Sequence, residues 1–215
     1  MPPGPAPGHQ PEPRVPSPPG LGGPGFDPGR EVFERLLERR MVVVSGHLDA
    51  ELANLVAAQL MLLDGSGDGP IELHLWCPDA ELDAGLAVAD TIDAVGVPVH
   101  ALCRGRLGGA ALAPLAAARR RIVQPHAVLV LSEPSIEVSG RADNVAISVA
   151  AHRAQLAVLQ ERLATSSGQT EDRIRTDMAA GVILDAVAAV AYGLVDEVAS
   201  NRPSAQADST PLTNT

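Results

Sequence analysis

The chain has 215 residues, 46% of them hydrophobic, which is enough for one domain with a sizeable core and flanking segments. Its formal net charge is −10, and its basic residues are dispersed apart from Arg39–Arg40 and 119–121, which argues against nucleic acid as a partner. All 16 Lys and Arg positions hold arginine, so chemistry that needs a lysine, such as a Ser–Lys dyad or a Schiff base, is excluded.

Both ends of the chain have the composition of disordered segments. Residues 1–29 are rich in Pro and Gly and lack the apolar stretch of a signal peptide, so they predict a disordered tail, as do residues 201–215. The domain is therefore expected at residues 30–200. No run reaches the roughly 18 uncharged apolar residues of a membrane span. Cys77 and Cys103 lie in apolar stretches, as expected of reduced thiols in a cytoplasmic protein.

The first half of the chain alternates between the apolar spacing of strands and that of helices. Asp49 stands where its side chain can cap a helix after a run of valines. This alternation predicts an α/β fold with a mostly parallel sheet and helices packed on it. In chain order, we expect a helix at 30–39, a strand at 41–44, a helix from Asp49 to the Gly-rich segment 64–69, a strand at 71–76, a loop at Pro78, a helix through Leu86, Val88 and Ile92, and a strand at 97–103.

The second half contains the longest helical pattern of the chain. A loop at 105–109, an Ala-rich helix at 110–118 and a strand at 127–131 precede it. Residues 144–165 then carry one apolar stripe with charged residues outside it, which predicts a long helix whose stripe needs another surface. His152 lies on this stripe without a second ligand one turn away, so no metal site is expected. The stripe consists of Val145, Val149, His152, Leu156, Leu159 and Leu163.

Five short segments occur in a fixed order: 33–40 with the valine strand and Ser45–Gly46, then 54–60, 84–92, 167–169 and 192–196. In this order and at these separations, they resemble the Clp protease proteolytic subunit family, within the crotonase-like superfamily. The resemblance runs from about Val32 to Val198. It implies a crotonase/Clp protease-like core of repeated ββα-type units with a projecting helical handle. It also implies a family of ATP-dependent serine endopeptidases that need no cofactor.

The resemblance also implies assembly into oligomeric rings with copies of this chain or with other Clp-type subunits. The handle would make contacts between rings, and an AAA+ ATPase chaperone would dock on apolar residues near Phe33 and Leu60. Both helices can equally be ordinary core elements. The handle residues on this interpretation are Val149, His152, Leu156, Leu159 and Leu163.

The three catalytic positions of the family do not hold catalytic residues in this chain. The family's serine lies in a Gly-x-x-x-Ser-Met-Gly turn, which corresponds to residues 105–111 and places Gly109 at the serine. Its histidine, in a His-Gln-Pro triplet, corresponds to Ser132, and its aspartate corresponds to Gly181. Glycine cannot attack a carbonyl, and a serine hydroxyl cannot replace imidazole as a general base near neutral pH. The chain is therefore expected to be inactive by itself.

The oxyanion hole of the family is altered as well. Its Pro-Gly-Gly segment corresponds to Pro78-Asp79-Ala80, and the other position expected to contribute is Ala110. A carboxylate at Asp79 would oppose the negative charge that develops in acyl transfer. His126 cannot rescue the triad within its own strand, because six extended residues separate it from Ser132 by roughly 20 Å.

Two alternatives to a non-catalytic ring subunit remain open. The first is a crotonase-type acyl-thioester enzyme, because residues 107–110 are somewhat similar to the Gly-rich turn of that branch; Glu81, Asp83 or Glu133 would then supply a base. The second is a stand-alone pseudo-protease that binds peptides in a vacant cleft lined by Gly109, Ser132 and Gly181. Concentration-dependent ring assembly would favour the non-catalytic subunit. A monomer that binds peptides would favour the pseudo-protease.

Overall fold

The structure is a computed structural model that describes residues 28–200. The tails predicted at 1–29 and 201–215 lie outside the described residues, except that Pro28 and Gly29 begin helix α1 (Pro28–Glu38). The chain divides into two compact units, residues 1–35 and 36–215. The described part of the first unit is the start of α1, where Arg35 forms an ion pair with Glu31 one turn away. The other elements belong to the second unit.

The larger sheet is parallel throughout, with the strand order β1-β2-β3-β5-β8. Leu73 and Leu75 of the second strand are buried, whereas Trp76 between Leu75 and Cys77 is exposed, because successive residues of a strand point to opposite faces. The strands are β1 (Met41–Leu48), β2 (Ile71–Ala80), β3 (Val99–Cys103), β5 (Arg120–Val123) and β8 (Glu197–Val198). The predicted α/β fold with a mostly parallel sheet is confirmed.

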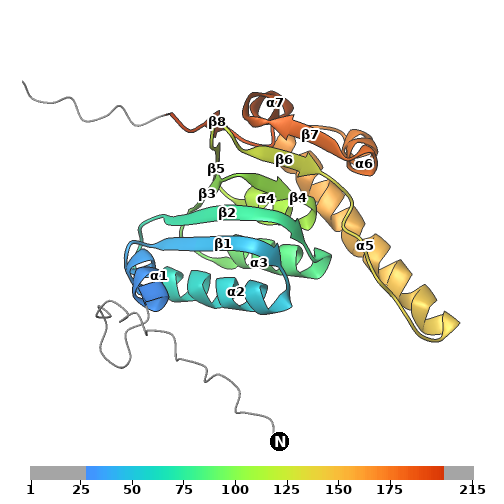
Figure 1. The fold of residues 1–215 in the computed structure, drawn as a ribbon, viewed down its shortest axis with the longest axis horizontal. Coiled ribbons are helices and arrows are strands. Elements are labelled where there is room, and N and C mark those ends of the chain that lie inside the picture. The colour runs from blue at the N-terminus through green and yellow to red at the C-terminus, as the bar shows by residue number, and fades with distance from the viewer. Residues whose placement is uncertain (1–27, 201–215) are drawn as a thin grey trace, which may run out of the picture. The chain divides into compact units, whose positions relative to one another are not determined.

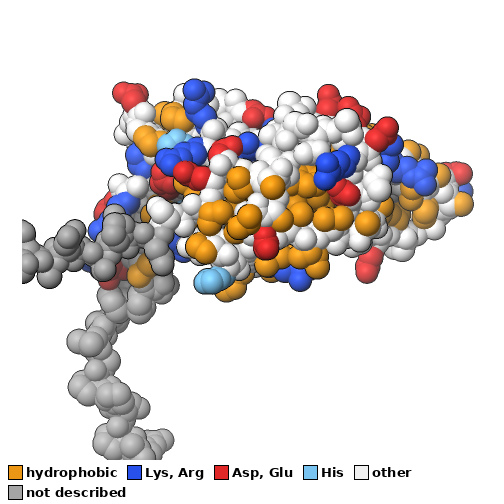
Figure 2. Space-filling view, turned by 90° about the horizontal axis from the view of Figure 1, so that it is seen from above, with side chains coloured by type: hydrophobic (Ala, Val, Ile, Leu, Met, Phe, Trp, Pro, Cys, Tyr) orange, Lys and Arg blue, Asp and Glu red, His pale blue; other side chains and the backbone are white. Residues whose placement is uncertain are grey.

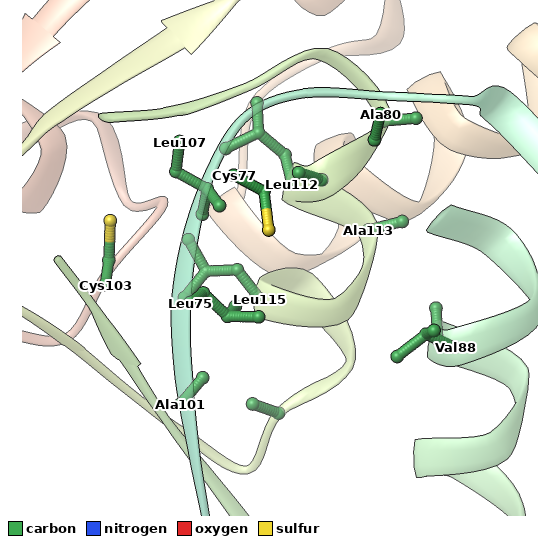
Figure 3. Close-up of a cluster of buried hydrophobic side chains, with 14 of the residues drawn as sticks. Leu75, Cys77, Ala80, Val88, Ala101, Cys103, Leu107, Leu112, Ala113 and Leu115 are labelled. Carbon is green, nitrogen blue, oxygen red and sulfur yellow. The ribbon is translucent and has the colours of Figure 1, made fainter. Parts of the chain in front are cut away.

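Three helices contribute buried residues to the core next to this sheet. They are α2 (Ala50–Asp64), α3 (Leu82–Ala94) and α4 (Leu112–Ala117), and Figure 1 shows α2 and α3 running beside β1 and β2. Asp49 caps α2 as predicted, because its carboxylate accepts a hydrogen bond of 2.9 Å from the Leu52 N–H. In Figure 3, Leu75 and Cys77 of β2 lie next to Leu112 and Leu115 of α4 in a fully buried cluster.

A second, smaller sheet follows the larger one in the chain. It has the order β4-β6-β7, with β4 (Arg106–Gly108) parallel to β6 (Val128–Leu131) and β6 antiparallel to β7 (Val182–Asp185). A single turn of 3-10 helix, η1 (Gly109–Ala111), connects β4 to α4. The small sheet therefore brings residues near 109, 131 and 182 to one end of neighbouring strands.

The edge of the larger sheet is closed by the two-residue strand β8. The Asp196 N–H donates a hydrogen bond of 2.8 Å to the Arg121 carbonyl oxygen. The Arg121 guanidinium forms an ion pair of 2.5 Å with the Asp196 carboxylate. Arg120 forms a second ion pair with Glu197. Arg120 and Arg121, which belong to a basic cluster in the sequence, thus link β5 to the segment of β8 through ion pairs.

The long helix α5 (Ala142–Ser167) is packed at one end and exposed at the other. Leu159 and Leu163 are fully buried, and Leu156 packs against the core, whereas Ile147 and Val158 are 68% and 48% exposed. Figure 1 shows the amino-terminal half of α5 extending beyond the sheets, and Figure 2 shows hydrophobic side chains among charged ones toward that tip. Helices α6 (Glu171–Ala180) and α7 (Ala186–Tyr192) follow.

The segment around Pro78 is part of β2 and not the loop that the sequence predicts. Ser45 pairs with Trp76 and His47 pairs with Asp79, so Cys77 and Pro78 occupy a bulge opposite Gly46. Proline lacks an N–H, and a bulge is a place where a strand tolerates it. The 105–109 loop likewise contains β4, and β5 was not anticipated at all.

Candidate active site

The three positions that the family resemblance assigns to a triad lie together at one end of the small sheet. Gly109 follows β4, whose last residue Gly108 pairs with Val130. Ser132 follows β6, and Gly181 precedes β7, directly beyond the pair formed by Leu131 and Val182. The fold therefore brings Gly109, Ser132 and Gly181 to neighbouring strand ends, although 72 residues separate the first from the last.

Gly109 lies next to two polar side chains. A β-carbon built on Gly109 would lie 3.7 Å from Ser132 Oγ and 3.9 Å from Asp79 Oδ1. These are ordinary van der Waals distances, so a β-carbon has room there. The backbone φ of Gly109 is +56°, a left-handed conformation that costs an L-residue roughly 1–2 kcal/mol. In the present sequence, the position carries no atom that could act as a nucleophile.

Two other glycines bring the surrounding backbone segments close together. A β-carbon on Gly108 would lie 2.8 Å from the Pro78 carbonyl oxygen, and one on Gly85 would lie 2.3 Å from the Ala110 carbonyl oxygen. Any larger residue would push β2 away from β4 or α3 away from η1. Glycine at these two positions therefore sets the distance between the Pro78 segment, α3 and the Gly109 turn.

Of the three positions expected to form an oxyanion hole, only Asp79 presents its side chain to solvent. The Asp79 side chain is 71% exposed, and its Oδ2 lies 3.5 Å from Nδ1 of His47. Ala80 and Ala110 are buried. A carboxylate beside Gly109 makes this region unfavourable for the negative charge of a tetrahedral intermediate. His47 was not anticipated as part of the site, because the bulged register of β1 and β2 brings it next to Asp79.

A cavity of about 570 Å³ adjoins this region and shares His47 with it. Glu81 and Asp83, which the acyl-thioester alternative considers as bases, line the cavity, whereas Glu133 does not appear in its lining and is exposed. Across the cavity, His152 of α5 bonds through Nε2 to the Pro134 carbonyl oxygen at 3.1 Å. The complete lining is His47, Glu81, Leu82, Asp83, Ser135, Ile136, Glu137, His152 and Gln155.

The residues predicted as an oligomer handle divide into two groups. Leu159 and Leu163 are fully buried in the chain's own core, and Leu156 packs against it. His152 holds the segment after β6, and Val149 is half-buried. The large apolar residues that α5 leaves exposed are Ile147 and Val158, and the stripe defined by helical spacing did not include them.

The cysteines do not offer a replacement nucleophile. Burial raises the pKa of Cys77 to about 11 and that of Cys103 to about 12, where the nearby Cys77 adds to the effect of burial. Both thiols are fully buried and so remain protonated near neutral pH, whereas only a thiolate is a good nucleophile.

Within residues 28–200, no group of three or more His, Cys, Asp or Glu side chains has a metal-binding arrangement. In the same part of the chain, no helix combines the length and the apolar character needed to cross a bilayer.

The family of the chain follows from its sequence match, and the fold agrees with it. The described residues form a mixed α/β domain with a parallel sheet flanked by helices, which is consistent with the fold that the resemblance implies. The sequence matches the Clp protease family over residues 28–202. The chain therefore belongs to the Clp protease family, and its domain is that of a Clp-type proteolytic subunit.

Proposed function

We propose that this chain is a non-catalytic subunit of a Clp-type protease, which assembles with itself or with active subunits and contributes structure or regulation instead of peptide cleavage. The observation that carries the proposal is the left-handed Gly109 at the expected nucleophile position, with Ser132 as its nearest side chain. Without a nucleophile the chain cannot form an acyl-enzyme, and without a general base it cannot take the proton from an attacking group. An AAA+ ATPase chaperone is the further partner that membership of the family suggests.

The charge around the turn also supports a non-catalytic role. Oδ1 of the exposed Asp79 carboxylate lies 3.9 Å from the position of a β-carbon on Gly109, and its Oδ2 lies 3.5 Å from Nδ1 of His47. The same carboxylate counts against the acyl-thioester alternative, because a thioester enolate would develop negative charge beside it. The cavity lined by His47, Glu81 and Gln155 keeps peptide binding without cleavage as a second candidate. We place the protein in the cytoplasm, since both cysteines are free and buried.

The test is fluorophosphonate labelling of the purified protein, alone and mixed with the other Clp-type subunits of its genome, with masses read by native mass spectrometry. We expect no label on this chain and its presence in a ring beside labelled partners. Labelling of any serine of this chain would overturn the proposal. A peptide-binding monomer that enters no ring would favour the second candidate.

A restoration experiment tests the assignment of the positions themselves. The variant Gly109→Ser, Ser132→His, Gly181→Asp and Asp79→Gly should become reactive toward fluorophosphonate, because it supplies a nucleophile, a base and a neutral oxyanion region. The matched control replaces Gly109 by Ala in the same background, so that both variants carry the same backbone strain. A folded serine variant that labels no better than its alanine control would show that these positions are not the catalytic ones.

A further inference from the structure

The cavity of about 570 Å³ is lined by segments that lie far apart in the sequence. Glu81, Leu82 and Asp83 come from the start of α3, and residues 135–137 come from the segment that joins β6 to α5. Figure 1 shows this joining segment running along α5. Residues of β1 and α5 complete the lining. The volume is typical of sites for small molecules, which span roughly 300–1,000 Å³.

The lining contains three carboxylates and no arginine. Within residues 28–200, Glu81, Asp83 and Glu137 form no ion pair. The Glu81 side chain makes no capping hydrogen bond at the start of α3, and the Asp83 carboxylate accepts a hydrogen bond of 2.9 Å from the Ala84 N–H. Three negative charges therefore meet at one cavity without a positive partner from the described part of the chain.

The two histidines of the lining do not replace the missing positive charge. Nδ1 of His47 lies 3.5 Å from Oδ2 of Asp79, so a carboxylate outside the lining already offsets any charge on this imidazole. Nε2 of His152 lies 3.1 Å from the Pro134 carbonyl oxygen, which can only accept a hydrogen bond. Nε2 therefore carries the proton of a neutral His152, and its Nδ1 is left as an acceptor.

Apolar side chains accompany the carboxylates in the lining. Leu82 is buried, and Ile136 is 43% exposed. An aliphatic chain can pack against such side chains while ammonium groups along it pair with the carboxylates. Three ammonium groups would match the three carboxylates in number. A ligand that carries its own carboxylate or phosphate would instead be repelled by them.

We infer that this cavity binds an aliphatic polyamine, whose ammonium groups pair with Glu81, Asp83 and Glu137 and whose methylene chain packs against Leu82 and Ile136. The bound ligand would connect the start of α3 to the segment between β6 and α5. This inference goes beyond the proposed function, because it depends neither on ring assembly nor on whether the chain cleaves peptides.

Isothermal titration calorimetry of spermidine into the full-length protein, in buffer of physiological salt concentration, measures this binding. Triacetylated spermidine keeps the chain and lacks the charges, whereas magnesium chloride supplies positive charge without an apolar chain. We expect saturable binding of spermidine and at least roughly ten-fold weaker binding of both controls, since each lacks one half of the recognition. Binding of magnesium as tight as that of spermidine would identify a simple cation site and overturn the inference.

A charge-neutral cavity tests which carboxylates are responsible. The variant Glu81→Gln, Asp83→Asn and Glu137→Gln should bind spermidine at least roughly ten-fold more weakly than the wild type, because three ion pairs are lost together. Circular dichroism confirms that the variant is folded. Unchanged affinity in this folded variant would overturn the inference.

The matched control removes the same number of charges outside the cavity. It is Glu51→Gln, Glu133→Gln and Asp143→Asn, at three exposed residues that do not line the cavity, and it should keep the affinity of the wild type. An equal loss of affinity in both variants would mean that spermidine responds only to the net charge of the protein, which would also overturn the inference.

A second readout locates the bound ligand. His47 and His152 line the cavity, whereas the exposed His126 does not. Spermidine should therefore shift the imidazole NMR signals of His47 and His152 and leave that of His126 in place. A tripeptide with a central arginine, N-acetylated and C-amidated, is titrated in the same way. Shifts confined to His126, or tighter binding of the tripeptide than of spermidine, would contradict a polyamine site in this cavity.

Discussion

His74 makes the stability of this protein depend on pH in a defined direction. Burial and Arg104 lower its pKa in the folded state, whereas in the unfolded chain its pKa is about 6.5. Above that value both states are neutral, so His74 contributes no pH dependence. Below it the unfolded chain binds a proton that the folded chain does not, and the free energy of unfolding falls, by up to about 1.4 kcal/mol per pH unit.

Urea unfolding between pH 7.5 and pH 5 measures this effect. His74→Gln should flatten the pH dependence, while His126→Gln, at an exposed histidine, should leave it as in the wild type. If the free energy of unfolding of His74→Gln changed with pH as steeply as that of the wild type, His74 would not be the group responsible.

At the scale of single residues, the sequence assigns three positions that the structure brings together, but it does not predict the side chains around them. Gly109, Ser132 and Gly181 follow from the family's motifs, and the structure brings them together. His47 could not be found in this way, because its contact with Asp79 depends on a bulge that shifts the pairing of β1 and β2. No local pattern in the sequence specifies that shift.

Helix α3 depends on one glycine for its approach to the Gly109 turn. In Gly85→Ala, the new methyl would lie 2.3 Å from the Ala110 carbonyl oxygen, which forces the helix and the turn apart. Although alanine favours a helix over glycine, overpacking should dominate and lower the free energy of unfolding by roughly 1–3 kcal/mol.

Chemical denaturation compares this variant with Gly65→Ala, where φ is −73° and a β-carbon would lie 3.7 Å from its nearest atom. The control should keep the stability of the wild type. An unchanged midpoint for Gly85→Ala would mean that α3 can shift at little cost.

The elements with the strongest periodicity were the ones that the sequence predicted. The valine strand, the helix capped by Asp49 and the long helix near the carboxy terminus are confirmed. The strands at 106–108, 120–123, 182–185 and 197–198 were missed, because they have only two to four residues and three of them carry exposed charges. Short strands such as these are defined by pairing with distant segments and have no periodicity of their own.

At the scale of the whole molecule, the proposed assembly predicts which part of α5 matters. Ile147 and Val158 are exposed on the helix, whereas Leu159 and Leu163 are buried in the chain's own core. We expect Ile147→Ser with Val158→Ser to weaken ring formation at least roughly ten-fold, since the variant loses the apolar area that these two side chains would bury in a contact. Analytical ultracentrifugation over a concentration series measures the change.

The control for this experiment is Val187→Ser, at a valine that is 72% exposed on α7. Circular dichroism confirms that each variant is folded. Equal assembly of the wild type and the α5 variant would exclude this helix as the contact. An equal loss of assembly in Val187→Ser would show that the effect is not specific to α5.

The short strand β8 also determines how the larger sheet ends. A parallel sheet with an open edge offers unpaired backbone groups to other chains, and here the edge at β5 is covered by two residues held through Arg120–Glu197 and Arg121–Asp196. Added salt screens partly exposed ion pairs such as these. Ionic strength should therefore act on the cover of the edge more than on the core, and we expect concentrated salt to favour strand-to-strand aggregation of folded chains relative to dilute buffer.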